Sequence, residues 1–236
     1  MDLKNARVLI TGSSVGIGYA TAALAKERGA RVFLNGRRAD RLDAAMARLD
    51  APGLLADVSE MDSCRSLVDA ARDAMGGIDV LINNAGWGRR MSLEEFDGSV
   101  AEAIWKTNVL GVAQMTQLCL DDLKASSSAA VVNIASTAAL RGYAGGSAYC
   151  SSKFALRGMT ECWRAELRPH DIRVLLVNPS EVQTCFFGGE PGEREMNPKK
   201  LHSEDIAHAI CGALEMDDRG FIPELSVFAT NPFPSS

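Results

Sequence analysis

A tyrosine, a lysine and a serine stand at spacings that could transfer a proton. Tyr149 and Lys153 are four positions apart, and Ser136 comes thirteen positions before the tyrosine, directly after a strand-like run. A helix over 148–168 would place the phenol and the ammonium on one face, one turn apart. A buried cation beside a phenol favours the phenolate, so we expect a tyrosine pKa below its ordinary value of about 10 and a proton donor usable near neutral pH. For this pair alone, a half-buried tyrosine and a solvated lysine are the alternative.

A glycine-rich turn follows the first apolar run and precedes a helical pattern. It reads T-G-S-S-V-G-I-G and offers five candidate cofactor contacts, Gly12, Ser14, Gly16, Ile17 and Gly18. Glycines let the backbone turn tightly and approach a pyrophosphate at the positive end of a helix. The G-x3-G-x-G spacing differs from the G-x-G-x-x-G fingerprint, and a compact connection is the alternative. The position of the turn after the first strand favours nucleotide binding.

Two arginines follow the second strand, where an NAD-specific site would offer an acid to the ribose. A guanidinium pairs bidentately with phosphate, so Arg37, helped by Arg38, is placed to hold a 2′-phosphate. The sequence therefore predicts NADP(H) as the cofactor. Asp40 nearby keeps an NAD site open as the alternative.

Composition and charge narrow the class of protein. The 236 residues carry 25 Lys and Arg against 30 Asp and Glu, a net charge of −5, which disfavours a nucleic-acid partner. We find no signal peptide and no apolar run of membrane-spanning length, so a cytoplasmic protein without a membrane partner is expected. The six cysteines are scattered, which indicates neither a disulfide framework nor a metal site. Cys150 and Cys185 adjoin the candidate site, but we assign them no role.

Short β-branched runs alternate with amphipathic stretches along the chain. This alternation predicts a single α/β domain over 1–236, a doubly wound Rossmann fold with helices on both faces of a seven-stranded parallel sheet. The expected strands are Arg7–Thr11, Arg31–Asn35, Gly53–Ala56, Ile78–Ile82, Ala129–Ile134, Ile172–Asn178 and Phe221–Phe228.

Two further segments suggest contacts with partners. Apolar residues wrap most of the expected helix near 101–124, so this helix and the one near 148–168 are expected to form a homodimer or homotetramer interface. A monomer whose loops cover them is the alternative. Residues 185–200 open on a glycine-rich stretch beyond the sixth strand, which predicts a substrate-binding loop.

As a set, these residues resemble the short-chain dehydrogenase/reductase family, over nearly the whole chain and most of all its NADP(H)-preferring carbonyl and 3-oxoacyl reductases. The agreement extends over separate motifs: Thr11-Gly12-x3-Gly16-x-Gly18, Asp57-Val58, Asn83-Asn84-Ala85-Gly86, Asn108, and Ser136 with Tyr149 and Lys153. The resemblance implies that hydride passes between nicotinamide and a substrate carbonyl while Tyr149 transfers the proton. Ser136 would hold the oxygen, Lys153 would bind the ribose and lower the tyrosine pKa, and Asn108 would hold a water.

The resemblance also implies further cofactor contacts, at Asp57, Val58, Asn84, Ala85, Gly86, Pro179, Val182 and Thr184. The chain departs from the family where Ser180 follows Pro179, because the family has glycine there and glycine tolerates positive φ. This departure weakens the transfer of roles to Val182 and Thr184. Position 15 is valine rather than a basic residue, so Arg37 must provide most of the NADP preference.

The implied function is NADPH-dependent reduction of a ketone, aldehyde or 3-oxoacyl group, with a small carbonyl or alcohol as substrate. A non-catalytic NADP sensor or scaffold and an NAD-dependent alcohol dehydrogenase are the alternatives. A nucleotide-sugar epimerase is disfavoured, because residues 180–236 leave little room for a sugar-binding domain. A carboxylate substrate could use Arg89 or Arg141, although surface arginines are usually solvated. The expected pocket residues are Trp87, Arg89, Arg90, Met91, Arg141, Tyr143, Phe186 and Phe187.

Overall fold

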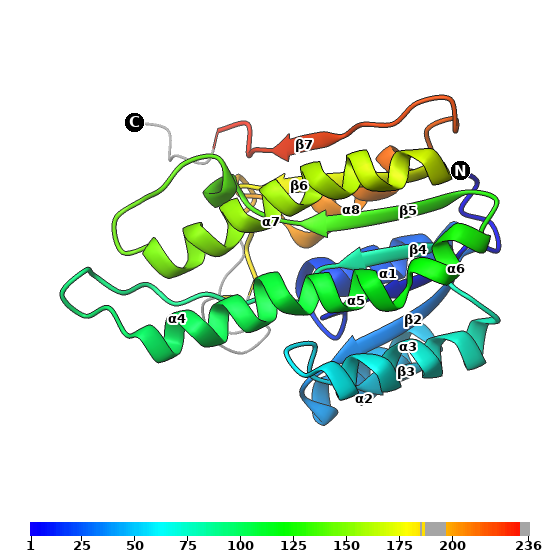
Figure 1. Cartoon of the computed structure of the whole chain (residues 1–236), viewed down its shortest axis with the longest axis horizontal. Coiled ribbons are helices and arrows are strands. Elements are labelled where there is room, and N and C mark those ends of the chain that lie inside the picture. Colours follow the sequence, from blue (N-terminus) through cyan, green and yellow to red (C-terminus); the bar gives the residue numbers. More distant parts are fainter. Residues whose placement is uncertain (185, 187–196, 232–236) are drawn as a thin grey trace.

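Seven parallel strands form one sheet in the order β3-β2-β1-β4-β5-β6-β7 (Figure 1). The computed structural model describes residues 1–184, 186 and 197–231. The order reverses between β1 and β4, which opens a crevice beyond the carboxyl ends of these strands. The strands are β1 (Arg7–Ile10), β2 (Arg31–Gly36), β3 (Gly53–Leu55), β4 (Val80–Asn83), β5 (Ala129–Ile134), β6 (Ile172–Pro179) and β7 (Glu224–Val227). The predicted doubly wound fold is confirmed.

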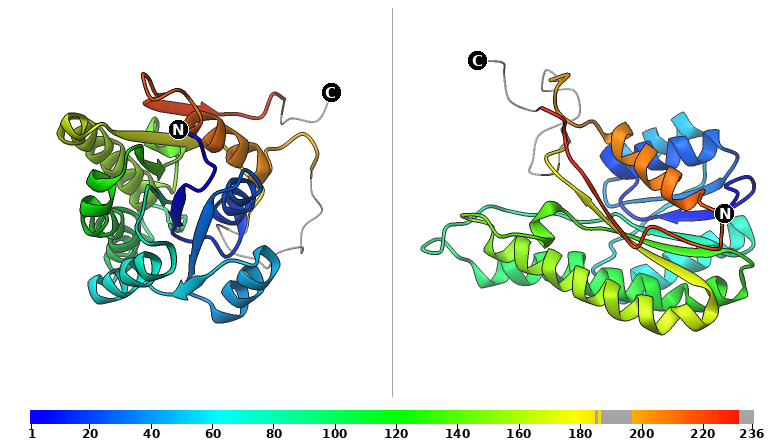
Figure 2. Two further views of the ribbon diagram at one scale, coloured as in Figure 1. Left: turned by 90° about the vertical axis from the view of Figure 1, so that its right-hand side faces the viewer. Right: turned by 90° about the horizontal axis from the view of Figure 1, so that it is seen from above.

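Helices cover both faces of the sheet, as the two side views show (Figure 2). The α-helices are α1 (Gly16–Glu27), α2 (Ala39–Leu49), α3 (Met61–Met75), α4 (Gly98–Trp105), α5 (Val112–Leu118), α6 (Leu120–Ala125), α7 (Ser147–Leu167) and α8 (Ser203–Leu214). Shorter turns are the π-helical η1 (Lys106–Gly111) and the 3-10 turns η2 (Thr137–Ala139) and η3 (Arg168–His170). Within the described residues, none of these helices combines the length and apolar character needed to cross a membrane.

Alternate residues of β1 pack into the two apolar layers. Val8 and Ile10 belong to the layer that includes residues of α1, α2 and α8, whereas Leu9 belongs to the layer with α3, α5 and α6. All three side chains are fully buried. Because helices shield both faces of this parallel sheet from water, its strands are continuous apolar runs in the sequence. This burial fixes the positions of the loops at the carboxyl edge.

The expectation of one continuous helix near 101–124 is wrong. The segment divides into α4, η1, α5 and α6. At the π-helical turn, Gly111 lies so close to the backbone of Val58 that a Cβ there would be 2.5 Å from the Val58 carbonyl oxygen. π-helical turns insert an extra residue into a helix and frequently accompany functional sites. The periodicity of the apolar residues did not reveal this local change.

Large apolar side chains remain exposed on the outer surface of this segment and of α7. Trp105 is 38% exposed, Leu110 51% and Phe154 44%. Such residues suit burial against another protein surface. The homodimer or homotetramer interface expected there involves a second copy of the chain, and it stays a prediction.

Hydrogen bonds from one asparagine join η1, α7 and the segment after β4. The amide nitrogen of Asn108 donates to the hydroxyl of Ser152 (3.0 Å) and to the carbonyl of Trp87 (2.9 Å). Its Oδ1 accepts from the Trp87 backbone N–H at 3.0 Å. The Ser152 hydroxyl then donates to the carbonyl of Tyr149 at 2.7 Å. Asn108 and Ser152 are buried, so water cannot easily replace these bonds.

We predict that Ser152→Ala lowers the free energy of unfolding by about 1–3 kcal/mol, because a buried amide donor loses its acceptor. Ser151 provides a matched control on the exposed face of the same helix. Its hydroxyl accepts from the partly exposed indole of Trp105 and donates to the Ala148 carbonyl. Ser151→Ala should cost less, since water can satisfy the indole. Urea titration of both variants measures the difference, and equal losses would contradict the role given to Ser152.

Candidate active site

The three residues predicted to transfer a proton converge at the carboxyl end of β5. Ser136 follows β5 and precedes η2, while Tyr149 and Lys153 occupy the first turns of α7. The Ser136 side chain is hydrogen-bonded to the Tyr149 phenol. Lys153 Nζ donates to the Ile134 carbonyl at 2.8 Å and lies 5.8 Å from the centroid of the Tyr149 ring. Both α7 side chains are buried, at 7% and 3% exposure.

The pKa of Tyr149 does not follow the sequence expectation. Burial raises the pKa of the phenol above its ordinary value, and the hydrogen bond with Ser136 offsets this only in part. Lys153 is not among the groups that shift it. Burial also lowers the pKa of Lys153 to about 8. The expected acidification of the tyrosine by the lysine is therefore wrong for the protein by itself, because burial of the phenol sets the direction of the shift and Lys153 does not contribute to it.

The glycine-rich turn lies in close backbone contact with the segment after β4. Gly12 has a φ of 62°, and a Cβ there would be 2.8 Å from Ala85 Cα. A Cβ at Gly18 would collide with Nδ2 of Asn84. This amide group donates to the carbonyls of Thr11 (3.0 Å) and Gly12 (2.8 Å). The structure thus brings Asn84 and Ala85 together with the turn, after which α1 begins at Gly16.

Two buried side chains that the sequence interpretation missed support the turn. The Oδ1 of Asn35, in β2, accepts from the backbone N–H of Gly12 at 3.1 Å. Ser13 Oγ donates to the Ile10 carbonyl at 2.8 Å and accepts from the Asn35 N–H at 2.9 Å. In the sequence, this support could have been found from Asn35, a side-chain amide near the end of the otherwise apolar strand β2. Such a buried group needs partners, and here the partner is the turn.

The predicted 2′-phosphate residues lie at the carboxyl end of β2. Arg37 is half exposed, and its Nη1 is 3.4 Å from the carboxylate of Asp57. Burial acts to raise the pKa of Asp57, but hydrogen bonds from Ser59 and the charge of Arg37 outweigh it and hold the pKa below its ordinary range. Arg38 pairs with Asp40 at 2.7 Å.

Two further candidates lie beside these charged groups. A Cβ at Gly36 would be 3.0 Å from Ser14 Oγ, so the turn and the arginines are neighbours. Val58 is buried next to Asp57, at 4% exposure. The candidates Ser14, Arg37, Asp57 and Val58 therefore lie around one end of the crevice.

Further candidate cofactor-binding residues lie between the glycine-rich turn and α7. A Cβ at Gly86 would be 3.1 Å from Asn108 Oδ1 and 3.6 Å from Lys153 Nζ. Thr184 lies beside the turn, because a Cβ at Gly16 would be 3.6 Å from its methyl group. Ile17 is partly buried and packs in the layer below the turn.

The segment after β6 keeps ordinary backbone geometry. Pro179 ends β6, and Val182 forms a bridge with Leu201. Ser180 is not in the left-handed region, and its N–H donates to the Val227 carbonyl at 2.9 Å. The departure from the family pattern at Ser180 therefore needs no positive φ here. Residues 185 and 187–196 of the expected substrate loop, with Cys185 and Phe187, lie outside the described residues.

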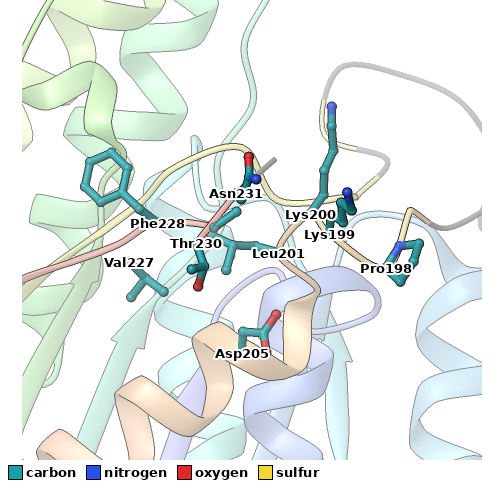
Figure 3. A pocket seen from close by; sticks show the side chains of 10 residues that line it. Pro198, Lys199, Lys200, Leu201, Asp205, Val227, Phe228, Thr230 and Asn231 are labelled. Atoms are coloured by element: carbon teal, nitrogen blue, oxygen red, sulfur yellow. The ribbon is translucent and has the colours of Figure 1, made fainter. Parts of the chain in front are cut away.

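A hollow of about 520 Å³ lies elsewhere, beside the start of α8 (Figure 3). It is lined by residues 198–201, Asp205 and 227–231 and contains none of the residues that converge on Tyr149. One of its lysines, Lys200, pairs with Glu181 at 2.7 Å. The hollow is therefore separate from the residues gathered around Tyr149.

Comparisons with known proteins identify the family of the chain. The chain is 32% identical to an NADP-dependent 3-hydroxy acid dehydrogenase of Schizosaccharomyces pombe, over 97% of this chain and 94% of that protein. It is 31% identical to a gluconate 5-dehydrogenase of Gluconobacter oxydans, over 95% and 86%. A short chain dehydrogenase of Burkholderia cenocepacia, solved in complex with NADP, superposes with a TM-score of 0.87 at 28% identity, covering 97% of this chain and 98% of that one. A profile of the family described as short chain dehydrogenase matches residues 6–192, and the chain belongs to this family.

Proposed function

We propose that this protein is an NADP(H)-dependent oxidoreductase that interconverts a carbonyl and an alcohol, with Tyr149 as the general acid and base. The observation that carries the proposal is the convergence of Ser136, Tyr149 and Lys153 near a glycine-rich turn that has no room for a Cβ at Gly12 or Gly18. Membership of the family supports it. The relatives named for NADP or solved with it support the choice of cofactor.

The residues of the crevice fit a dinucleotide. The turn presents backbone N–H groups at the start of α1, and Arg37 provides a cation at the far end. When bound, the nicotinamide supplies or accepts the hydride. Arg38 pairs with Asp40 at 2.7 Å, whereas Arg37 makes a longer contact with Asp57 at 3.4 Å. Arg37 is therefore the main candidate for a 2′-phosphate, and Asp40 is poorly suited to a ribose. This pairing favours NADP over the NAD alternative.

Each of the three residues Ser136, Tyr149 and Lys153 has a distinct role in proton transfer. The raised pKa keeps the Tyr149 phenol protonated at neutral pH, which suits a donor to the carbonyl oxygen during reduction. Ser136, bonded to the phenol, would hold the same oxygen in place. Lys153 would hold its ammonium beside the phenol and stabilise the phenolate that proton donation leaves. The Asn108 side chain is committed to Trp87 and Ser152, so we assign it a positioning role.

The names of two relatives suggest a class of substrate. One is named for 3-hydroxy acids and the other for gluconate, which keeps hydroxy acids and their oxo forms among the candidate substrates. A non-catalytic sensor of the same fold is the second candidate function, but every member of the predicted catalytic set is present in the site.

Replacing the phenol tests the catalytic proposal directly. We predict that Tyr149→Phe lowers kcat for carbonyl reduction by at least about 10²-fold, the usual contribution of a general acid. The ring and its contact with Phe186 remain, so NADPH binding, followed by fluorescence, should be retained. Near-normal turnover in this variant would remove Tyr149 from the mechanism and favour the sensor.

The pH dependence of carbonyl reduction should follow the charge of Lys153. Because burial lowers the pKa of Lys153 to about 8, its ammonium is present below that pH and is lost as the pH rises through it. We therefore expect kcat/KM for reduction to fall as the pH rises through about 8, since this ratio reports the groups of the free enzyme. Initial rates from about pH 6 to about pH 10 measure the profile. A level profile across that range would show that the charge on Lys153 is not needed.

Arg37 should determine the cofactor preference. We predict that Arg37→Ala raises the Kd of NADPH by about 10–100-fold, the worth of hydrogen bonds to a charged group, and changes the Kd of NADH much less. Arg31→Ala is the matched control, because this exposed arginine begins the same strand at its opposite end. Fluorescence titration with both nucleotides measures the difference. Equal weakening of the two would remove the basis for NADP specificity.

A further inference from the structure

We propose that Gln183 is a positioning residue of the dinucleotide site, because its side-chain amide clamps the backbone of Asn197 and fixes the segment that runs past the glycine-rich turn to Tyr149. The inference deepens the proposed function and rests on it, since it assigns this segment to the nicotinamide half of the cofactor. It is carried by the two hydrogen bonds of the amide, by the backbone contacts around them, and by the contacts of Thr184 and Phe186.

The clamp consists of two hydrogen bonds between a side-chain amide and the backbone of one residue. Gln183 Oε1 accepts from the Asn197 N–H at 2.7 Å, and Gln183 Nε2 donates to the Asn197 carbonyl at 2.9 Å. The side chain thereby pairs with Asn197 as a residue of an antiparallel strand would. A carboxylate at this position would lack the donor, and an ammonium would lack the acceptor. The chemistry of the contact therefore requires an amide.

Hydrogen bonds within residues 197–200 fix the backbone that the clamp holds. Asn197 Oδ1 accepts from the Lys199 N–H at 2.9 Å, and the Asn197 carbonyl accepts from the Lys200 N–H at 3.1 Å. A carbonyl oxygen has two lone pairs, so the Asn197 carbonyl can serve Lys200 and Gln183 together. The clamp therefore joins the segment after β6 to a turn with bonds of its own, directly before α8.

Backbone contacts next to the clamp hold the same two segments together. The Gln183 N–H donates to the Leu201 carbonyl at 3.0 Å. Val182 and Leu201 form a parallel bridge. Both the backbone and the side chain of Gln183 are thus tied to residues 197–201. These contacts fix the chain at the residue directly before Thr184.

Beyond the clamp, the chain reaches both the glycine-rich turn and the proposed acid. A Cβ at Gly16 would be 3.6 Å from the methyl group of Thr184. The ring of Phe186 meets Tyr149 edge to face, with centroids 5.5 Å apart. The Phe186 N–H donates to the Thr184 hydroxyl at 3.3 Å, which links the two residues. A shift of Gln183 would therefore disturb contacts at the start of α1 and at the Tyr149 ring together.

The clamped segment and the arginine after β2 would serve different halves of the dinucleotide. The proposed function assigns the 2′-phosphate to Arg37 and proton transfer to Tyr149. The nicotinamide must lie close to the residue that transfers the proton, because hydride and proton go to the same carbonyl group. Thr184 and Phe186 lie between the turn and Tyr149. We therefore expect the clamp to support binding of the nicotinamide half and to leave the 2′-phosphate end unaffected.

The test compares the whole cofactor with a fragment that lacks the nicotinamide. Gln183→Met keeps an unbranched side chain of similar length and removes both bonds of the clamp. We expect this variant to raise the Kd of NADPH and of NADH by about 3–10-fold, as the loss of one or two modest hydrogen bonds would do. The Kd of adenosine 2′,5′-bisphosphate, which carries only the adenine end, should not change. Isothermal titration calorimetry measures all three.

Lys200→Met is the matched control, because it removes a different side-chain contact between the same two segments. Lys200 Nζ pairs with the exposed carboxylate of Glu181 at 2.7 Å. Surface pairs of this kind contribute little, so this variant should bind all three ligands like the wild type. Equal weakening of NADPH and of the fragment in Gln183→Met would indicate general damage and overturn the positioning role. An equal loss of NADPH binding in Lys200→Met would overturn it as well.

The outcomes also separate this inference from the proposed function. An enzyme that reduces carbonyls, but whose Gln183→Met variant binds NADPH like the wild type, retains the proposed function and refutes the clamp. A protein that binds NADPH without turning over any carbonyl or alcohol refutes the catalytic proposal, and the binding test of Gln183 still gives its result because it needs no turnover. Failure of the wild type to bind any nicotinamide dinucleotide refutes both.

Discussion

The close contact between the glycine-rich turn and the segment after β4 is the constraint on which the rest of the crevice depends. Ala85 occupies the space that a side chain at position 12 would need, and Asn84 occupies that of position 18. The Asn84 amide also donates to two carbonyls of the turn. Thr11 Oγ1 accepts from the backbone N–H groups of residues 84 and 85. These bonds hold together the ends of β1 and β4, where the strand order reverses. A dinucleotide bound across them would meet a surface already formed.

A second constraint is the burial of two ionisable side chains in the first turns of α7. An ammonium away from water is costly unless it has partners, and Lys153 uses the carbonyl that ends β5. Burial moves the pKa values of lysine and tyrosine in opposite directions, downwards for Lys153 and upwards for Tyr149. Both shifts favour the uncharged forms. Below about pH 8 Lys153 still carries its charge, so the phenolate left by proton donation would have a cation beside it.

Spacing along the chain was enough to predict the strands, the turn and the grouping of Ser136, Tyr149 and Lys153. These features depend on local periodicity and on the rule that parallel strands end at one edge. Spacing could not predict the direction of the Tyr149 pKa, because that depends on how deeply the ring is buried. It also missed η1, which follows from the fit of Gly111 against Val58, and the support of the turn by Asn35.

Arg37 has an anionic partner that an incoming phosphate must displace. Arg37 pairs with Asp57 at 3.4 Å in a half-exposed position, and such a pair is worth about 0–1 kcal/mol. A phosphate could therefore take the guanidinium at little cost. The pair between Arg37 and Asp57 can therefore exchange one anion for another, so a chain with a net charge of −5 can still hold a phosphate at this end of the crevice.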